Sequence, residues 1–433
     1  MWFWALLAVA AAALAACGGD VERAPVTPTP RPPPPVDRIA YVGDDGNIYT
    51  VRGDGSRREQ VTRLNSGPVA SLAVAGLAQS RSAYYAWPTW SPDGTRIAAS
   101  RVVTEGVPGT GVDLRVIDLA NGAETVVFQN DPSGVGFVAQ GAPHYPYWRP
   151  GGEHVAFLAS GAPGLSLYTA DAATGGGAAQ VISGAPLYFV WSRTGEGALL
   201  NAQGQLYTAE WSGKLEPEEL PLTAAGFRTP GFSHDGRRMA FGVPTATGHV
   251  TLHTADADGS DPAPLAEVAE SVAFLWSPTG PLLAHSNGLM PRLSLFEGFI
   301  VRDTEADEVV VAVSDPTLAF AWSPDGSRLA YAALDEGQEW LVWKVAGLDG
   351  AEPRELVRFL PSPEMFIWLS YFDQYAHSHA VWSPDSSRLV FAGRVPEPDG
   401  SVPARDHVIV LDVEGLAEPM LVAVGTTAFW SWR

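Results

Sequence analysis

A five-residue pattern, an aromatic residue followed by Ser-Pro-Asp-Gly or a close variant, recurs along nearly the whole chain. Successive copies begin 41 to 60 residues apart. The copies are Trp90-Ser-Pro-Asp-Gly94, Trp148-Arg-Pro-Gly-Gly152, Trp191-Ser-Arg-Thr-Gly195, Phe232-Ser-His-Asp-Gly236, Trp276-Ser-Pro-Thr-Gly280, Trp322-Ser-Pro-Asp-Gly326, Trp382-Ser-Pro-Asp-Ser386 and Trp430-Ser431. A period of about 40 to 50 residues is typical of four-stranded units repeated around a ring.

Each part of the pattern has a physical reason. Ser-Pro-Asp-Gly fits a type I turn with Pro at its second position, and Gly then supplies the left-handed residue that closes a hairpin. The residues before the turn are apolar, and a second strand such as 328–331 and a third such as 407–411 follow it. The pattern therefore predicts an all-β fold, a β-propeller of eight four-stranded blades whose repeated aromatic side chains pack between blades.

The two ends of the repeat region complement each other. Residues 38–42 match the second strand of a unit, whereas residues 428–432 match the first strand and then stop. We therefore expect one blade to be shared by both termini, which closes the ring and removes exposed sheet edges. The alternative count, without the degenerate unit at Trp191, is seven blades.

These units resemble the repeats of TolB-type β-propellers, on the strength of Trp-Ser-Pro-Asp-Gly followed by Arg, an apolar residue, Ala and an aromatic residue. The resemblance covers nearly all of residues 38–433. It implies a propeller fold and leaves function open, because propellers serve as binding proteins, enzymes and scaffolds alike.

The first 37 residues predict export and lipid anchoring. Residues 1–16 contain an apolar run too short for a comfortable membrane span, and Leu14-Ala15-Ala16-Cys17 resembles the lipobox of bacterial lipoproteins. No Lys or Arg precedes this run, which departs from the usual signal. We interpret residues 1–16 as a signal peptide and residues 17–37 as lipidated Cys17 with a Pro-rich linker. The propeller then occupies residues 38–433, lipid-anchored to a bacterial membrane and facing the periplasm or the cell exterior.

Composition excludes some classes of function. The net charge of −21 argues against a nucleic-acid partner, because phosphate binding needs clustered Lys and Arg. Cys17 is the single cysteine, so no intrachain disulfide can form. The sequence has no Gly-x-Ser-x-Gly elbow and no Walker-type phosphate loop. The Asp-rich turns at 44–47 and 256–261 lack the full spacing of a calcium-binding loop. No catalytic set is predicted.

Irregular segments before the inner strands are the candidate binding residues. The connections that lead into inner strands surround one mouth of a propeller channel, so we expect their aromatic, basic and histidine side chains to converge there. The predicted set is Tyr84, Tyr85, Trp87, His144, Tyr145, Arg228, Trp368, Tyr371, Tyr375, His377 and His379. The last five lie in the insertion 368–379, in one of the two longest intervals between repeats.

The predicted function is a non-catalytic envelope module without a cofactor, which binds a protein, peptide or glycan at this mouth. One alternative is a metal-dependent polysaccharide lyase or hydrolase. His377 and His379, two apart on a strand, would share a face, and with His144 and Gln374 they could hold a divalent ion. That set resembles the metal site of TolB-like oligogalacturonate lyases. A scaffold subunit of an envelope complex is the other alternative. The ligand and the oligomeric state are left open.

Overall fold

The computed structural model describes residues 37–64, 83–104, 110–130, 141–161, 164–225, 228–268, 271–290, 293–337 and 339–433. The predicted signal peptide, Cys17 and nearly all of the Pro-rich linker therefore lie outside the described residues. Within these ranges, no helix has the length and apolar character needed to cross a membrane.

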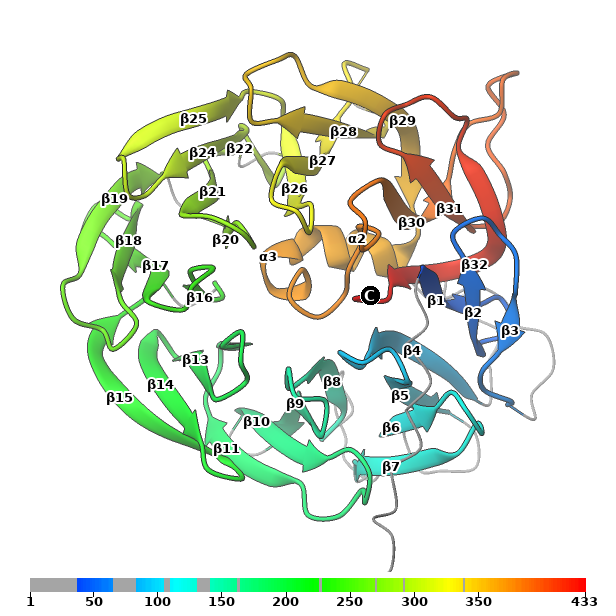
Figure 1. Ribbon diagram of the computed structural model, residues 1–433, viewed down its shortest axis with the longest axis horizontal. Helices are drawn as coiled ribbons and strands as arrows, with labels where there is room; N and C mark the ends of the chain where they lie inside the picture. Colours follow the sequence, from blue (N-terminus) through cyan, green and yellow to red (C-terminus); the bar gives the residue numbers. More distant parts are fainter. Residues whose placement is uncertain are drawn as a thin grey trace, which may run out of the picture. The chain divides into compact units, whose positions relative to one another are not determined.

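Residues 34–433 form one unit, and its described part contains five four-stranded antiparallel sheets and one twelve-stranded sheet. Figure 1 shows the sheets side by side in a ring. The first two sheets consist of β4 (Ala83–Trp90), β5 (Arg96–Val103), β6 (Gly111–Asp118) and β7 (Glu124–Gln129), and of β8 (Pro143–Trp148), β9 (His154–Gly161), β10 (Gly164–Asp171) and β11 (Ala179–Ser183).

The next three sheets follow in chain order. They consist of β12 (Leu187–Trp191), β13 (Gly197–Ala202), β14 (Gln205–Trp211) and β15 (Leu215–Thr223); of β16 (Gly231–Phe232), β17 (Arg238–Pro244), β18 (Val250–Asp256) and β19 (Ala263–Val268); and of β20 (Phe274–Trp276), β21 (Leu282–Ser286), β24 (Phe299–Asp303) and β25 (Glu308–Val313). The first strand of each of these five sheets ends at a repeat aromatic residue, as predicted.

The twelve-stranded sheet joins the last predicted units to the first. In spatial order it contains β22 (Leu289–Met290), β23 (Leu295–Phe296), β26 (Thr317–Trp322), β27 (Arg328–Leu334), β28 (Leu341–Gly347), β29 (Arg354–Pro361), β30 (Arg388–Arg394), β31 (His407–Asp412), β32 (Met420–Trp430), β1 (Arg38–Gly43), β2 (Ile48–Arg52) and β3 (Glu59–Gln60). Because this ladder is continuous, it does not divide into separate blades, and the count of eight stays a prediction.

The predicted joining of the two ends is confirmed. The first part of β32 pairs with β31, and its last part pairs with β1, where Ile39 is opposite Trp430 and Tyr41 is opposite Ala428. One eleven-residue strand therefore belongs to two neighbouring units. This pairing gives β1 and the end of β32 backbone partners and leaves neither as a free sheet edge.

The repeated Trp residues form a second, regular connection between neighbouring units. In five of the seven repeat Trp residues, the indole N–H donates to the backbone carbonyl of the residue that precedes the aromatic position in the preceding unit. The pairs are Trp90 Nε1 to Phe429 O (3.1 Å), Trp148 Nε1 to Thr89 O (3.1 Å), Trp276 Nε1 to Gly231 O (3.2 Å), Trp322 Nε1 to Leu275 O (3.0 Å) and Trp382 Nε1 to Ala321 O (3.1 Å). The repeated Trp residue thus fills the space between two neighbouring units and also joins them by a hydrogen bond.

The Ser-Pro-Asp-Gly turns have the predicted geometry. Ser91 Oγ donates to Asp93 Oδ1 at 2.6 Å, and Gly94 has a φ of 68°, which glycine adopts without steric cost. The equivalent Ser233 hydroxyl lowers the pKa of Asp235 by hydrogen bonding to its carboxylate. We call the side of the ring that carries these turns the turn face, and the side where the inner strands begin the strand-start face.

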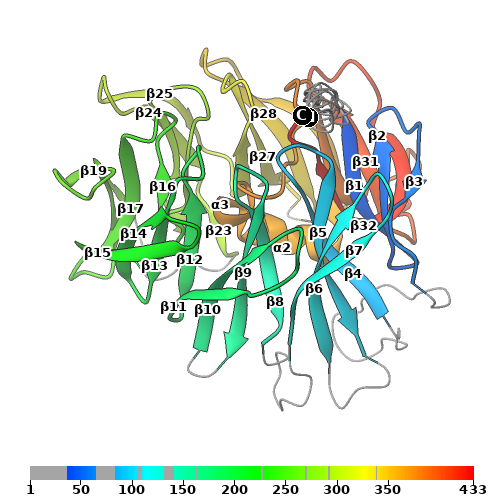
Figure 2. The same ribbon diagram turned by 60° about the horizontal axis from the view of Figure 1, so that its bottom comes forward.

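The insertion before the Trp382 unit is helical, whereas its sequence predicted only strands and loops. It forms α2 (Pro363–Ser370) and α3 (Phe372–Tyr375). Ser362 caps α2 by accepting from the Met365 amide at 3.1 Å, and Pro363 occupies the first turn, where its missing N–H costs nothing. Figures 1 and 2 show both helices inside the ring of sheets.

The helices fill the centre with apolar side chains. Met365, Trp368, Leu369 and Phe372 are buried in the same core cluster as β26, β30 and β32. Helix α3 contacts β12 and β26, which belong to well-separated sheets of the ring. The insertion is therefore a central plug, which we define as residues 363–379.

The indole hydrogen bonds allow a matched stability test. Trp148→Phe keeps an aromatic ring but loses the bond to Thr89, so the free energy of unfolding should fall by about 1 kcal/mol through that bond. Trp191 is the control, because its buried Nε1 has no hydrogen-bond partner in the described part of the chain. Trp191→Phe should lower the free energy of unfolding, measured by urea denaturation, by less than Trp148→Phe does. Equal losses for the two variants would show that ring volume alone matters.

Candidate binding site

Two cavities open on the strand-start face, one on each side of α2. The larger has a volume of about 770 Å³ and the smaller about 390 Å³. Phe366, Ser370 and Tyr371 line the larger cavity, whereas Glu364 and Ile367 line the smaller one. Helix α2 is therefore the wall between the two cavities.

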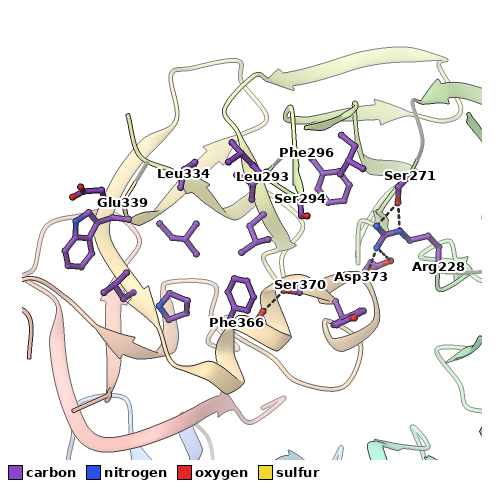
Figure 3. Close-up of a pocket in the computed structure, with 18 of the residues that line it drawn as sticks. Arg228, Ser271, Leu293, Ser294, Phe296, Leu334, Glu339, Phe366, Ser370 and Asp373 are labelled. Carbon is purple, nitrogen blue, oxygen red and sulfur yellow. Dashed lines mark hydrogen bonds and ion pairs between the residues drawn. The ribbon is translucent and has the colours of Figure 1, made fainter. Parts of the chain in front are cut away.

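The residues that line the larger cavity are mostly apolar, and many are leucines. They are Tyr188, Arg228, Ser271, Leu289, Leu293, Ser294, Leu295, Phe296, Leu318, Leu334, Glu339, Trp340, Leu341, Leu360, Pro361, Phe366, Ser370, Tyr371 and Asp373. Its volume falls in the range typical of ligand pockets, about 300 to 1,000 Å³. Figure 3 shows this cavity, with Leu293, Leu334 and Phe366 between its two polar ends.

Three apolar side chains of the plug stand out toward solvent. Phe366 is 51% exposed, Ile367 is 42% exposed and Tyr371 is 50% exposed. We call these three residues the plug ridge. Large apolar side chains that cluster beside cavities commonly mark an interaction surface, because water contact with them is unfavourable.

An ion pair closes one end of the larger cavity (Figure 3). Arg228 Nη1 lies 3.3 Å from Asp373 Oδ2, and Arg228 Nη2 donates to Ser271 Oγ at 2.8 Å. Burial raises the pKa of Asp373, and the Arg228 charge opposes that rise. The pair joins the plug to the connection before β16 and leaves this end polar but close to neutral.

The opposite end of the larger cavity carries Glu339 and Trp340, in the turn between β27 and β28. Both backbone amides donate to Asp335 Oδ1, at 3.0 and 3.1 Å. The Asp335 amide in turn donates to Trp340 O at 2.9 Å. These bonds hold the backbone of the turn from which the two side chains reach the rim of the cavity.

The smaller cavity contains four of the predicted binding residues. Tyr84, Tyr85, Trp87 and His144 all line it. The Tyr85 ring is otherwise buried, with its hydroxyl donating to Glu124 Oε2 at 2.8 Å. Arg228 and Tyr371 line the larger cavity instead, so the plug separates side chains that the sequence analysis expected at one common mouth.

Trp87, Tyr145 and Tyr375 have a packing role. Trp87 and Tyr145 both have positive φ, 55° and 52°, a conformation that costs free energy for residues other than glycine. The Tyr375 ring stacks on Trp87 at 4.7 Å and meets Tyr145 edge-on at 5.2 Å. The buried Tyr145 hydroxyl also donates to Gln374 O at 2.7 Å. These contacts hold α3 in place.

One expectation about the insertion is wrong. His377 and His379 follow α3 in a turn, not on a strand, so they do not share a strand face. Trp368 is only 1% exposed, because the side of α2 that carries it packs into the core. Its Nε1 donates to His379 O at 3.2 Å. Trp368 is thus almost fully buried, and it also lines a cavity on the turn face, so its predicted binding role stays a prediction.

The two histidines of the plug lie toward the other side of the ring. Both line a cavity of about 340 Å³ together with Pro278, Pro324 and Pro384 of the turn face. His144 lines the smaller cavity on the strand-start face, so the candidate metal ligands are divided between cavities. The described residues contain no group of three or more His, Cys, Asp or Glu side chains placed to hold a metal ion.

The His379 environment generates a pH-dependent prediction. The ring lies among Trp87, Tyr375 and Phe429, with Nδ1 2.7 Å from Ser378 Oγ, and burial lowers the pKa of His379 to about 3. In the unfolded chain His has a pKa of about 6.5. Between these values the unfolded state binds more protons, so stability falls as pH falls below about 6.5.

We therefore expect His379→Gln to reduce this dependence, and the part that is left comes from other histidines such as His377, whose pKa burial lowers to about 4. From pH 7 to pH 5 the wild type should lose about 2 kcal/mol more free energy of unfolding than the variant. Urea unfolding at pH 7, 6 and 5 measures the difference. The difference between the two profiles isolates the contribution of His379, because every other histidine is the same in both proteins. Parallel pH profiles for wild type and His379→Gln would contradict the assignment.

The ring of antiparallel sheets around a central plug defines the chain as a β-propeller. No protein-family model matches it, and no curated protein matches it in sequence. Among solved structures, the dihydro-heme d1 dehydrogenase NirN is similar with a TM-score of 0.55 and 14% identity, covering 95% of this chain and 78% of that one.

Other similar structures agree less well in shape. TolB from Acinetobacter baumannii has a TM-score of 0.36 and 15% identity, covering 73% of this chain and 65% of that one. Oligogalacturonate lyase from Vibrio parahaemolyticus has a TM-score of 0.46 and 14% identity, covering 65% of this chain and 78% of that one. The match thus spans less than two thirds of that TolB chain. At such identities only the fold is shared, and membership of the TolB-type family stays a prediction.

Proposed function

We propose that the chain is a non-catalytic binding module of the cell envelope, whose ligand is an extended segment of a partner protein. The observation that carries this proposal is the plug ridge, a row of exposed apolar side chains between two cavities. A segment lying across the ridge could place one side chain in each cavity. Binding of this kind depends on a few large apolar anchors in preformed pockets.

The lining favours a polypeptide over a glycan. Sugars present many hydroxyl groups, and each one needs a hydrogen-bond partner when it leaves water. The larger cavity offers few such partners, because its middle is lined by Leu293, Leu318, Leu334 and their neighbours. The smaller cavity, with Tyr84, Trp87 and His144, is where a glycan would fit better.

The export part of the proposal rests on the Cys17 motif. Replacing Cys17 by Ser removes the thiol that accepts the lipid, so we expect the variant to move from the membrane fraction to the soluble fraction. Ultracentrifugation of lysed bacteria and incorporation of labelled palmitate measure the change. An unchanged distribution, or labelling that survives the substitution, would contradict lipid anchoring at this residue.

A displayed library of random peptides tests the binding function. The full chain, purified in detergent, should enrich a family of peptides that bind saturably. Phe366→Asp places a charge on the plug ridge and should weaken that binding by about tenfold or more. Since Phe366 is half-exposed, the substitution should leave the unfolding midpoint nearly unchanged.

Leu416→Asp is the matched control, because Leu416 is 86% exposed and lines neither cavity. It should bind the enriched peptides as the wild type does. Binding of a panel of soluble oligosaccharides to the same full chain is measured in parallel. If no peptide is enriched, or if an oligosaccharide binds and Tyr84→Ala in the smaller cavity abolishes that binding, the protein-segment proposal is wrong.

A further inference from the structure

The larger cavity has uncompensated charge at one end only. Its charged lining residues are Arg228, Asp373 and Glu339. Arg228 and Asp373 neutralise each other at 3.3 Å. Glu339 is exposed and forms no ion pair with any residue in the described ranges. The end marked by Glu339 in Figure 3 is therefore the negative end of the cavity.

An aromatic side chain lies beside that carboxylate. Trp340 is partly buried, follows Glu339 directly and lines the same cavity. Their backbone amides both donate to Asp335 Oδ1, so the backbone from which the indole and the carboxylate project is held in one turn conformation. A cation beside an indole face and a carboxylate gains from both, and Lys and Arg side chains also bring long apolar stems.

The middle of the cavity fits a different side chain. Leu293, Leu334 and Phe366 lie between the two polar ends in Figure 3. No charged group other than the three named above lines the cavity. A large apolar side chain placed there loses water contact without leaving an unpaired polar group.

We infer that the bound segment carries a Lys or Arg side chain against Glu339 and Trp340, and a large apolar side chain in the leucine-lined middle. This inference rests on the proposed function and specifies the chemistry of its partner. The overall charge of −21 acts in the same direction, because it attracts basic partners over a distance. The partner is thus a basic and apolar polypeptide segment.

Peptides enriched on the full wild-type chain provide the probe. Each is resynthesised with its basic residue changed to Gln or to Glu, and binding is measured by fluorescence anisotropy at low and high salt. We expect the Gln peptide to bind about tenfold more weakly and the Glu peptide more weakly still. The difference between the basic and Gln peptides should shrink in high salt, since exposed charges are screened.

Charge reversal at the site supplies the decisive variant. Glu339→Lys should reverse the preference, so that the Glu peptide binds better than the basic one. Glu336→Lys is the matched control, because Glu336 is exposed in the same turn, undergoes the same charge change and does not line the cavity. It should keep the wild-type preference. Trp340→Leu should weaken the basic peptide and leave the Gln peptide almost unaffected.

The outcomes separate this inference from the proposed function. If the enriched peptides bind and depend on Phe366, but lack a basic residue or respond alike to Glu339→Lys and Glu336→Lys, the inference is wrong and the binding function stands. If no peptide binds the wild type, the proposed function fails first. Reversal in Glu339→Lys alone supports the inference.

Discussion

The structure depends on the antiparallel pairing of β1 with the end of β32. This pairing brings residue 39 opposite residue 430, nearly four hundred positions apart, so its chain-closure entropy is high. A second contact lies beside it, because the Trp90 indole on β4 of the neighbouring sheet donates to Phe429 O of β32. Without the pairing, β1 and the last unit would each present an unpaired sheet edge.

Closure also creates the space that the plug occupies. An open row of sheets would offer the insertion one surface, whereas a ring surrounds it with inner strands on all sides. Helix α3 contacts β12 and β26, and the Arg228–Asp373 pair ties the same helix to the connection before β16. The buried side of the plug therefore stabilises the ring, and its ridge carries the most exposed large apolar side chains of the plug.

The fold was predictable from the repeat because every unit has the same structural requirements. Each unit needs a tight turn and a large aromatic side chain between sheets, so Trp90 and its equivalents are visible in sequence. The central plug lacks that redundancy. Ser362 and Pro363 are a helix-start signal, but eight residues are too few for a helical period to stand out.

The candidate site was predictable only in part for the same reason. Tyr84, Trp87 and His144 were found because they come shortly before the repeat residues Trp90 and Trp148, and they do line a cavity. Phe366 and Glu339 were missed, since nothing local distinguishes an exposed Phe on a short helix from a buried one. Trp368, two residues further on, faces the core. Only the placement of α2 inside the ring decides which of the two side chains meets solvent.

The way the plug is held bears on how the site works. Trp87 and Tyr145 adopt positive φ, and both rings contact Tyr375, so strained backbone is maintained by packing around α3. A surface fixed in this way loses little conformational entropy when a ligand binds, which favours affinity without further folding. The same rigidity argues against a plug that withdraws to open a channel, because withdrawal would break the Arg228–Asp373 pair and expose Trp368 and Phe372 together. The centre of this propeller is therefore best understood as a fixed platform for recognition.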